Sequence, residues 1–327
     1  MNLSEIFNVV IEGVVVNKVQ KNPMSDRALR IVTKQLKEIF GQDYKIIDDI
    51  MNFTSYTYAK IKDFNILCYI MLLNYFTFHL DDYLDRNDNG EFKDIFLHLI
   101  NLVMLAWRKW FAILKAQKCG GNGLDERLFN LLIEKSNKLM DGITSQKFYR
   151  SIGDWVQLYP EMQRIKSDQA KISDQELLDM RVIDSMLPAE FMIAQLDAKL
   201  NSESLEDDPN WIQFNRYSAY VVVIVNELYS LKKEARDGQA HFNYVFIKMK
   251  NNGLTAQQAV DELVRELRQY QQLMHRFGDN LRELGIKGTD AYVKRIIGYT
   301  DGNLYWSTIC DRYNKLGIKQ KPLKNVM

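Results

Sequence analysis

Apolar residues recur at three- and four-residue steps along most of this chain, and this spacing limits the fold more than any other property of the sequence. The segments from Asp125 to Asp141 and from Ala256 to Gly278 show the pattern, with charged residues between the apolar ones. Such spacing places apolar side chains on one face of a helix, and the alternation typical of strands is nearly absent. The sequence therefore predicts an all-α protein.

Turn signals divide the chain into long helices. They lie at Asn89-Gly90, at residues 120–123, at Asp207-Asp208-Pro209 and at Asn251-Asn252-Gly253. The glycine cluster at 120–123 lacks the Gly-Lys-Ser/Thr ending of a phosphate-binding loop, and we interpret it as a connector. No Pro/Gly/Ser-rich linker interrupts the 327 residues, of which 46% are hydrophobic. We therefore expect residues 1–327 to form a single domain, a helical bundle.

The charge balance and the cysteines limit the partners and the location. The 43 basic and 42 acidic residues leave a net charge of +1, so nucleic acid is not expected as a partner. No apolar run approaches the ~20 residues that span a bilayer, and no signal-peptide pattern begins the chain. Cys68, Cys119 and Cys310 show no metal-ligand spacing and are interpreted as reduced thiols. A cytoplasmic location is expected.

A first acidic stripe follows the apolar run from Ile66 to Leu80. Asp81, Asp82 and Asp85 lie near the end of this predicted helix, where they face the negative end of the helix dipole and repel one another. A bound metal ion would relieve both effects. The alternative is an acidic helix end that is simply solvated.

A second polar stripe follows the apolar run 219–225. Asn226, Ser230 and Glu234 are four residues apart and therefore share one helix face. The neighbouring run should be buried, and buried polar groups need partners. Carboxylate, amide and hydroxyl oxygens suit Mg²⁺, which completes its coordination with water and with phosphate oxygens of a substrate. Two such stripes predict a magnesium site that acts on a phosphate ester.

At these residues the sequence resembles the class I terpene synthases of microbial type. The first stripe is similar to their aspartate-rich motif, and the second, with Lys233, is similar to their NSE motif. Three further segments resemble the family, and the resemblance runs in order from about residue 75 to residue 313. These segments are 180–185, 251–260 and 306–313.

The resemblance implies a class I terpenoid synthase bundle with three Mg²⁺ ions. It implies that the metal ligands are Asp81, Asp85, Asn226, Ser230 and Glu234, supported by Asp82. It implies that Arg181, Lys233, Arg312 and Tyr313 contact the diphosphate of the substrate. A homodimer is compatible with it.

A proline predicts a break in the helix that carries Arg181. Pro188 has no amide hydrogen to bond the carbonyl of Asp184, so carbonyl groups near residues 184 and 185 are left free. The resemblance implies that Arg181 senses the diphosphate, that Asp184 is its linker and that the Ser185 carbonyl stabilises a carbocation. Many relatives carry glycine where this chain has Ser185. The alternative is a proline kink whose carbonyls bond water or a hydroxyl.

Aromatic side chains are candidates for the wall of a cavity that holds a carbocation. We expect Phe78 and Trp306 to serve there, because a cation over a ring face gains ~2 kcal/mol or more when desolvated. The alternative for both residues is ordinary core packing. No side chain stands out in the sequence as a general base.

These observations predict a Mg²⁺-dependent terpene cyclase that acts on a linear isoprenyl diphosphate. Farnesyl diphosphate is slightly favoured over geranylgeranyl diphosphate by class frequency. A chain-elongating prenyltransferase is an alternative, but its family would require a second aspartate-rich motif where this chain has Asn226, Ser230 and Glu234. A squalene- or phytoene-type synthase is disfavoured by the same three residues. A helical scaffold or lipid-binding protein is the remaining alternative and would release no diphosphate.

Overall fold

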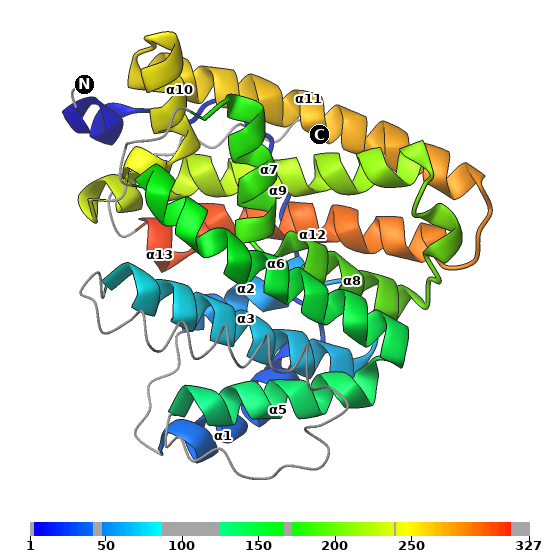
Figure 1. Ribbon diagram of the computed structural model, residues 1–327. Helices are drawn as coiled ribbons and strands as arrows, with labels where there is room; N and C mark the ends of the chain where they lie inside the picture. The colour runs from blue at the N-terminus through cyan, green and yellow to red at the C-terminus, as the bar shows by residue number, and fades with distance from the viewer. Residues whose placement is uncertain (1–2, 42–47, 87–123, 167–171, 239, 315–327) are drawn as a thin grey trace.

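The computed structural model describes residues 3–41, 48–86, 124–166, 172–238 and 240–314, and its regular elements in these ranges are all helices (Figure 1). The all-α prediction is confirmed. The α-helices are α1 (Ser25–Phe40), α2 (Asp48–Thr57), α3 (Phe64–Arg86), α5 (Leu124–Leu139), α6 (Gly142–Lys166), α7 (Asp174–Asp184), α8 (Leu187–Ala198), α9 (Pro209–Arg236), α10 (Tyr244–Asn252), α11 (Ala256–Glu283), α12 (Thr289–Ile309) and α13 (Asp311–Asn314). Short 3-10 turns lie at Leu3–Asn8, Glu203–Leu205 and Ala240–Phe242.

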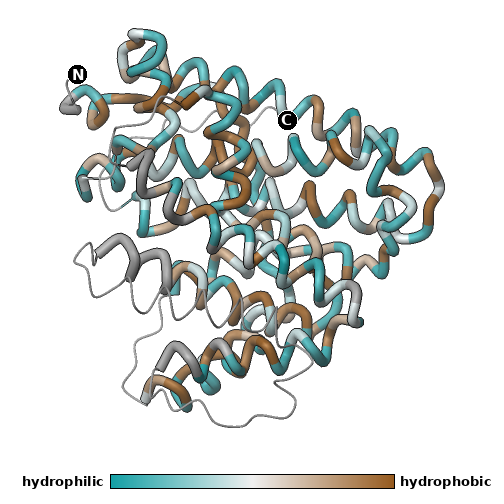
Figure 2. The backbone as a smooth tube through the Cα atoms, viewed as in Figure 1, coloured by the Kyte–Doolittle hydropathy of each residue, from teal (hydrophilic) through white to brown (hydrophobic). Residues whose placement is uncertain are grey.

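Helix α9 lies at the centre of the bundle. Residues 218–225 of α9 are all buried, and the helix packs most extensively against α11 and also against α12. Helix α11 buries residues at three- and four-residue steps, among them Ala259, Leu263 and Leu267, so it covers α9 with one face. Hydrophilic and hydrophobic segments accordingly alternate along α11 (Figure 2).

Local sequence signals fix several helix boundaries. The Asp208 carboxylate caps α9 by accepting from the amide of Asn210 at 2.7 Å, and Pro209 occupies the first helical position. Thr255 and Gln258 form a capping box at the start of α11, and Gly253 ends α10 with a positive φ of 66°. The other predicted turns, at Asn89-Gly90 and at residues 120–123, lie outside the described residues.

The predicted break before Pro188 is confirmed. Helix α7 ends at Asp184 and α8 begins at Leu187, with Pro188 in its first turn. Between them Met186 adopts a left-handed conformation (φ 52°, ψ 21°). The backbone hydrogen bonds of the described residues include none to the carbonyl oxygens of Asp184 and Ser185. Two carbonyl dipoles are therefore left at the break.

Helices α12 and α2 touch through their backbones. A Cβ atom added to Gly302 of α12 would lie 2.2 Å from the carbonyl oxygen of Tyr56 and 2.7 Å from the Cα of Thr57. Only glycine allows this approach, which brings the aromatic residues of α2 and α12 together.

Two further sequence predictions can be compared with the described residues. None of the described helices is long and apolar enough to cross a membrane. Cys68 and Cys310 are free and buried, and Cys119 lies outside the described residues.

The Gly302 contact leads to a prediction about stability. Gly302→Ala should force α12 away from α2 and lower the free energy of unfolding by about 1–3 kcal/mol, the usual cost of overpacking. Gly153→Ala is the matched control, because a Cβ at this position of α6 meets nothing within 4 Å. The control should be stabilising by roughly 0.5–1 kcal/mol. Thermal unfolding followed by circular dichroism measures both, and a Gly302→Ala variant as stable as the wild type would contradict the close contact.

Candidate active site

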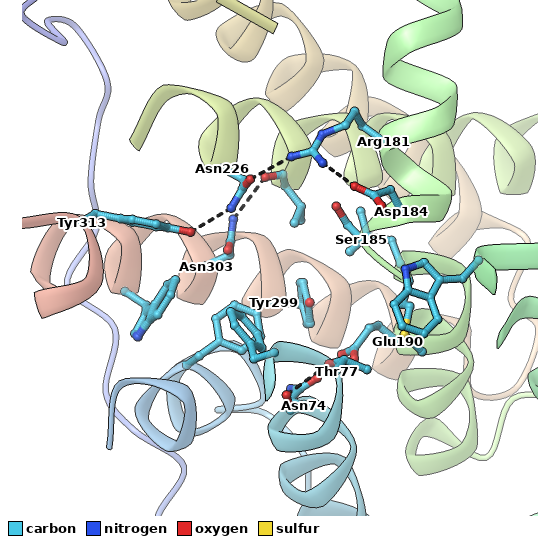
Figure 3. A pocket seen from close by; sticks show the side chains of 17 residues that line it. Asn74, Thr77, Arg181, Asp184, Ser185, Glu190, Asn226, Tyr299, Asn303 and Tyr313 are labelled. Carbon is cyan, nitrogen blue, oxygen red and sulfur yellow. Dashed lines mark hydrogen bonds and ion pairs between the residues drawn. The ribbon is translucent and has the colours of Figure 1, made fainter. Parts of the chain in front are cut away.

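A pocket opens between α2, α3, α6, α7, α8, α9, α12 and α13. The space within it, including its open mouth, is about 850 Å³. Polar side chains gather near α7 and α9, and aromatic ones near α2, α3 and α12 (Figure 3). The lining residues are Phe53, Asn74, Thr77, Phe78, Trp155, Arg181, Asp184, Ser185, Met186, Leu187, Glu190, Val222, Asn226, Tyr299, Asn303, Trp306 and Tyr313.

Arg181 is held at the pocket by three neighbours. Its Nε atom donates to Glu227 Oε1 at 2.7 Å, and its Nη2 atom lies 2.6 Å from the same oxygen. It also pairs with Asp184 and donates to Asn226 Oδ1 at 3.3 Å (Figure 3). The guanidinium group lies 4.8 Å from the ring centroid of Phe242. The structure thus brings Arg181 and Asp184 together as the sequence predicts.

The electrostatics of this cluster keep Arg181 charged. Burial lowers its pKa, but the carboxylates of Glu227 and Asp184 raise it by more, so the pKa of Arg181 lies above its ordinary value. Burial raises the pKa of Glu227, and the Arg181 guanidinium and the Tyr244 amide offset part of this effect. The Tyr244 amide donates to Glu227 Oε2 at 2.7 Å. A buried cation is therefore fixed at the rim of the pocket.

The α9 stripe lies where its spacing predicts, on one face of the helix. Asn226 lines the pocket, and its amide donates to the Tyr313 hydroxyl at 2.9 Å. Glu234 accepts from Asn243 Nδ2 at 2.9 Å. Ser230 is buried, and its Oγ has no hydrogen-bond partner among the described residues.

The Ser230 hydroxyl gives a physical reason to expect a metal ion. A buried hydroxyl without a partner is costly. It shares a helix face with an amide oxygen and a carboxylate, and all three are the hard oxygen ligands that Mg²⁺ takes. The donor set of α9 therefore fits Mg²⁺.

The α3 stripe can be placed only at the level of the backbone. Asp81, Asp82 and Asp85 lie in the last turns of α3, and their side chains are outside the described part of the structure. The C-terminal ends of α3 and α9 lie at the same end of the bundle, together with α13 (Figure 1). Among the described side chains, no three His, Cys, Asp or Glu residues form a group that could hold a metal ion.

The remaining predicted diphosphate contacts differ in their positions. Tyr313 is buried and lines the pocket. Arg312 lies beside the pocket, with its guanidinium carbon 5.7 Å from the ring centroid of Phe78. Lys233 pairs with Asp237 at 3.6 Å and is not among the described lining residues.

The predicted aromatic residues lie in the pocket wall and in the core at once. Phe53 stands between them, with its ring centroid 5.3 Å from that of Phe78 and 5.0 Å from that of Trp306. The indole Nε1 of Trp306 donates to the carbonyl oxygen of Asp49 at 2.9 Å. The Asp49 carboxylate accepts from the backbone amide of Arg312 at 2.8 Å. Phe78 and Trp306 therefore line the pocket and also pack in the core, so the same contacts fit both interpretations.

The sequence predictions lack several polar residues of the site, among them Glu227, Asn303 and Glu190. Glu227 anchors Arg181, and Asn303 lines the pocket with its amide 3.4 Å from the Val222 carbonyl oxygen. Glu190 also lines the pocket and is 4% exposed. The sequence held one signal for Glu190, because an acidic residue is unusual inside the apolar run of α8 (Leu187–Ala198).

Glu190 is a buried acid with one described hydrogen-bond partner for its side chain. Its Oε2 accepts from the hydroxyl of Tyr58, which follows α2. Burial raises the pKa of Glu190 to about 8, and the Tyr58 hydrogen bond opposes that shift. Among the described residues no ion pair involves Glu190.

The sequence matches a family of known proteins. The sequence model described as "Terpene synthase family 2, C-terminal metal binding" matches residues 73–272, more than half of the chain. No curated protein matches the sequence.

Similar solved structures cover nearly the whole chain. Linalool/nerolidol synthase from Streptomyces clavuligerus is 17% identical, with a TM-score of 0.73 over 90% of this chain and 99% of that chain. The 2-methylisoborneol synthase from Streptomyces coelicolor A3(2) is 16% identical, with a TM-score of 0.77 over 93% and 98%. A variant of cucumene synthase is 13% identical, with a TM-score of 0.72 over 92% and 100%. The fold is therefore the one that these synthases share.

The buried acid leads to a prediction about pH. The pKa of Glu190 is about 8 in the folded protein and ordinarily about 4.5. Between these values the folded state binds more protons than the unfolded state. The free energy of unfolding of the wild type therefore decreases as pH rises through this window. Glutamine still accepts from Tyr58 and has no proton to lose. The thermal midpoint of Glu190→Gln should therefore exceed that of the wild type by a margin that grows up to about pH 8.

Melting curves at about pH 5, 6.5, 8 and 9 test this expectation, because these pH values span the titration window. Glu283→Gln, at an exposed position on α11, is the control and should show no such trend. A difference between Glu190→Gln and wild type that stays constant with pH would show that this carboxyl does not titrate in the window.

Proposed function

The chain belongs to terpene synthase family 2, and we propose that it is a Mg²⁺-dependent cyclase of linear isoprenyl diphosphates. It would ionise the substrate to an allylic carbocation, close the chain to a terpene hydrocarbon or alcohol, and release diphosphate. One observation carries the proposal: a polar rim with Arg181, Asn226 and Tyr313 leads into an aromatic pocket (Figure 3).

The ligands of similar structures support the choice of substrate. One linalool/nerolidol synthase structure contains 2-fluorogeranyl diphosphate, and the 2-methylisoborneol synthase structure contains Mg²⁺ and 2-fluoroneryl diphosphate. We carry both classes of ligand to this chain as part of the proposal.

Two helices would hold the metal ions. Asn226, Ser230 and Glu234 of α9 would supply oxygens from one side, and Asp81 and Asp85 of α3, supported by Asp82, from the other. Three ions follow from the family resemblance. Bound Mg²⁺ supplies positive charge that stabilises the departing diphosphate.

The protein's own groups would complete the diphosphate site. Arg181 would donate to its oxygens as a fixed cation, held in position by Asp184 and Glu227. Tyr313 would add a neutral donor, and Lys233 and Arg312 would extend the site once their side chains turn toward it. Donors that are in place before ionisation favour the developing charge without reorganisation.

The deeper pocket would shelter the carbocation. Phe78 and Trp306, together with Phe53 and Tyr299, present aromatic rings to the space. Ser185 lines this space, and its carbonyl dipole would stabilise positive charge beside the departing diphosphate. These walls exclude water while the cation rearranges.

Several finer points belong to the proposal. Residues 1–327 would act as one catalytic domain, in the cytoplasm, with a homodimer allowed. Farnesyl diphosphate is favoured as substrate over geranylgeranyl diphosphate. Incubation with C10, C15, C20 and C25 diphosphates plus Mg²⁺, followed by mass spectrometry of the extract, tests both substrate and reaction. Longer prenyl diphosphates in place of terpenes would identify a chain-elongating enzyme instead.

The metal assignment predicts a loss of turnover without a loss of fold. Glu234→Gln should lower diphosphate release by at least about a hundredfold, because it removes the only charged ligand that α9 offers. The thermal midpoint should stay close to the wild-type value. Glu283→Gln on α11 is the matched control and should keep wild-type turnover. A Glu234→Gln enzyme with more than about half of wild-type turnover would contradict the assignment.

The diphosphate assignment of Arg312 predicts a smaller loss. Arg312→Gln should lower diphosphate release about ten- to a hundredfold, because a charged hydrogen bond contributes roughly 1.5–3 kcal/mol. Arg265→Gln is the control, since the Arg265 side chain is 69% exposed on α11. Steady-state kinetics with Mg²⁺ in excess measures both variants. Equal turnover in the two would remove Arg312 from the diphosphate site.

A further inference from the structure

Glu190 occupies a place in the pocket that the mechanism above leaves without a role. Asp184 and Glu190 are the carboxylic residues among the described lining residues, and Asp184 is engaged by Arg181. Glu190, Asn74 and Thr77 all line the pocket, and in Figure 3 they are drawn on the side away from Arg181, Asn226 and Tyr313. Glu190 therefore faces the part of the pocket that would hold hydrocarbon rather than diphosphate.

Packing alone does not account for an acid at this position. A buried carboxyl without a cation is costly, and an apolar residue would fill α8 at lower cost. Tyr58 holds one oxygen, Oε2, and Oε1 has no hydrogen bond from the described residues. One oxygen of a fixed carboxyl group is thus available to a molecule in the pocket.

Among the described residues, the titratable groups that interact with Glu190 from neighbouring elements are neutral phenols. They are Tyr58 after α2, Tyr69 on α3 and Tyr299 on α12, and burial raises the pKa of each phenol well above its ordinary value. Among the described residues of this wall, Glu190 is therefore the group whose pKa lies nearest to neutral pH. A carbocation in the pocket would favour its carboxylate form.

We propose that Glu190 is the proton acceptor that ends the carbocation reaction. A C–H bond next to the cationic carbon breaks, its electron pair forms the new C=C bond, and the proton bonds to Oε1 of the carboxylate. After the product leaves, the proton passes to water and restores the carboxylate. Tyr58 is a positioning residue that holds Oε2. The assignment rests on the proposed cyclase function and supplies the base that the sequence does not reveal.

Product analysis of Glu190→Gln tests the assignment, because the amide keeps the Tyr58 hydrogen bond but is not a base. The main deprotonated hydrocarbon of the wild type should fall at least about tenfold relative to total diphosphate released. Alcohols or alkenes formed by proton loss elsewhere should replace it. Tyr58→Phe should shift the products in the same direction to a smaller extent, and Glu283→Gln should leave them unchanged.

Failure of this inference can be told from failure of the proposed function. A wild-type enzyme that releases diphosphate, with the same product profile in Glu190→Gln, would overturn the role of Glu190 alone. So would a wild-type product that is solely an alcohol. A wild-type protein that releases no diphosphate from any prenyl diphosphate would overturn both.

A second measurement does not depend on whether the variant folds. In the wild type, the share of the deprotonated hydrocarbon among all products should rise between about pH 6 and pH 9, as Glu190 becomes ionised. The product share is independent of the ionisation rate, so general effects of pH on turnover cancel. A share that stays constant over this range would overturn the proposal.

Discussion

The buried ion pair between Arg181 and Glu227 joins the last turn of α7 to the central helix α9. Glu227 also accepts the first backbone amide of α10, from Tyr244, so one fully buried carboxylate connects three helices. Removing one partner of such a pair typically costs about 3–5 kcal/mol, because the other charge is left unpaired. The rim of the pocket is therefore stabilised by the same pair that positions its cation, and site and fold share this interaction.

Arg181 also contacts the preceding residue of α9. Glu227 connects Arg181 to α10, while Asn226 accepts from Arg181 and donates to Tyr313 of α13. Asn243 then bonds both the Glu227 carbonyl at 2.8 Å and the Glu234 carboxylate at 2.9 Å. Contacts with the ion pair and its neighbours thus hold Asn226 and Glu234, two of the three metal ligands that we propose on α9.

The sequence predicts the parts of this protein that depend on local chemistry. The caps at Asp208 and Thr255, the break before Pro188 and the four-residue stripe of α9 are all visible as short patterns, because each depends on residues close in the chain. Glu190 could not be assigned, since its role depends on which wall α8 presents to residues over a hundred positions away. The backbone contact at Gly302 also could not be predicted, because a glycine in a helical sequence does not indicate which helix packs against it.

Asp49 binds two elements at once, through its carbonyl to the Trp306 indole and through its carboxylate to the Arg312 amide. These bonds link the end of α12 to the start of α13 by way of α2. The aromatic wall and the segment that carries Arg312 and Tyr313 are therefore mechanically coupled. A movement of α13 toward a bound diphosphate either carries α2 and the indole with it or breaks a hydrogen bond to Asp49. While both hydrogen bonds hold, a shift of α13 is accompanied by a shift of α2 and of the indole in the pocket wall.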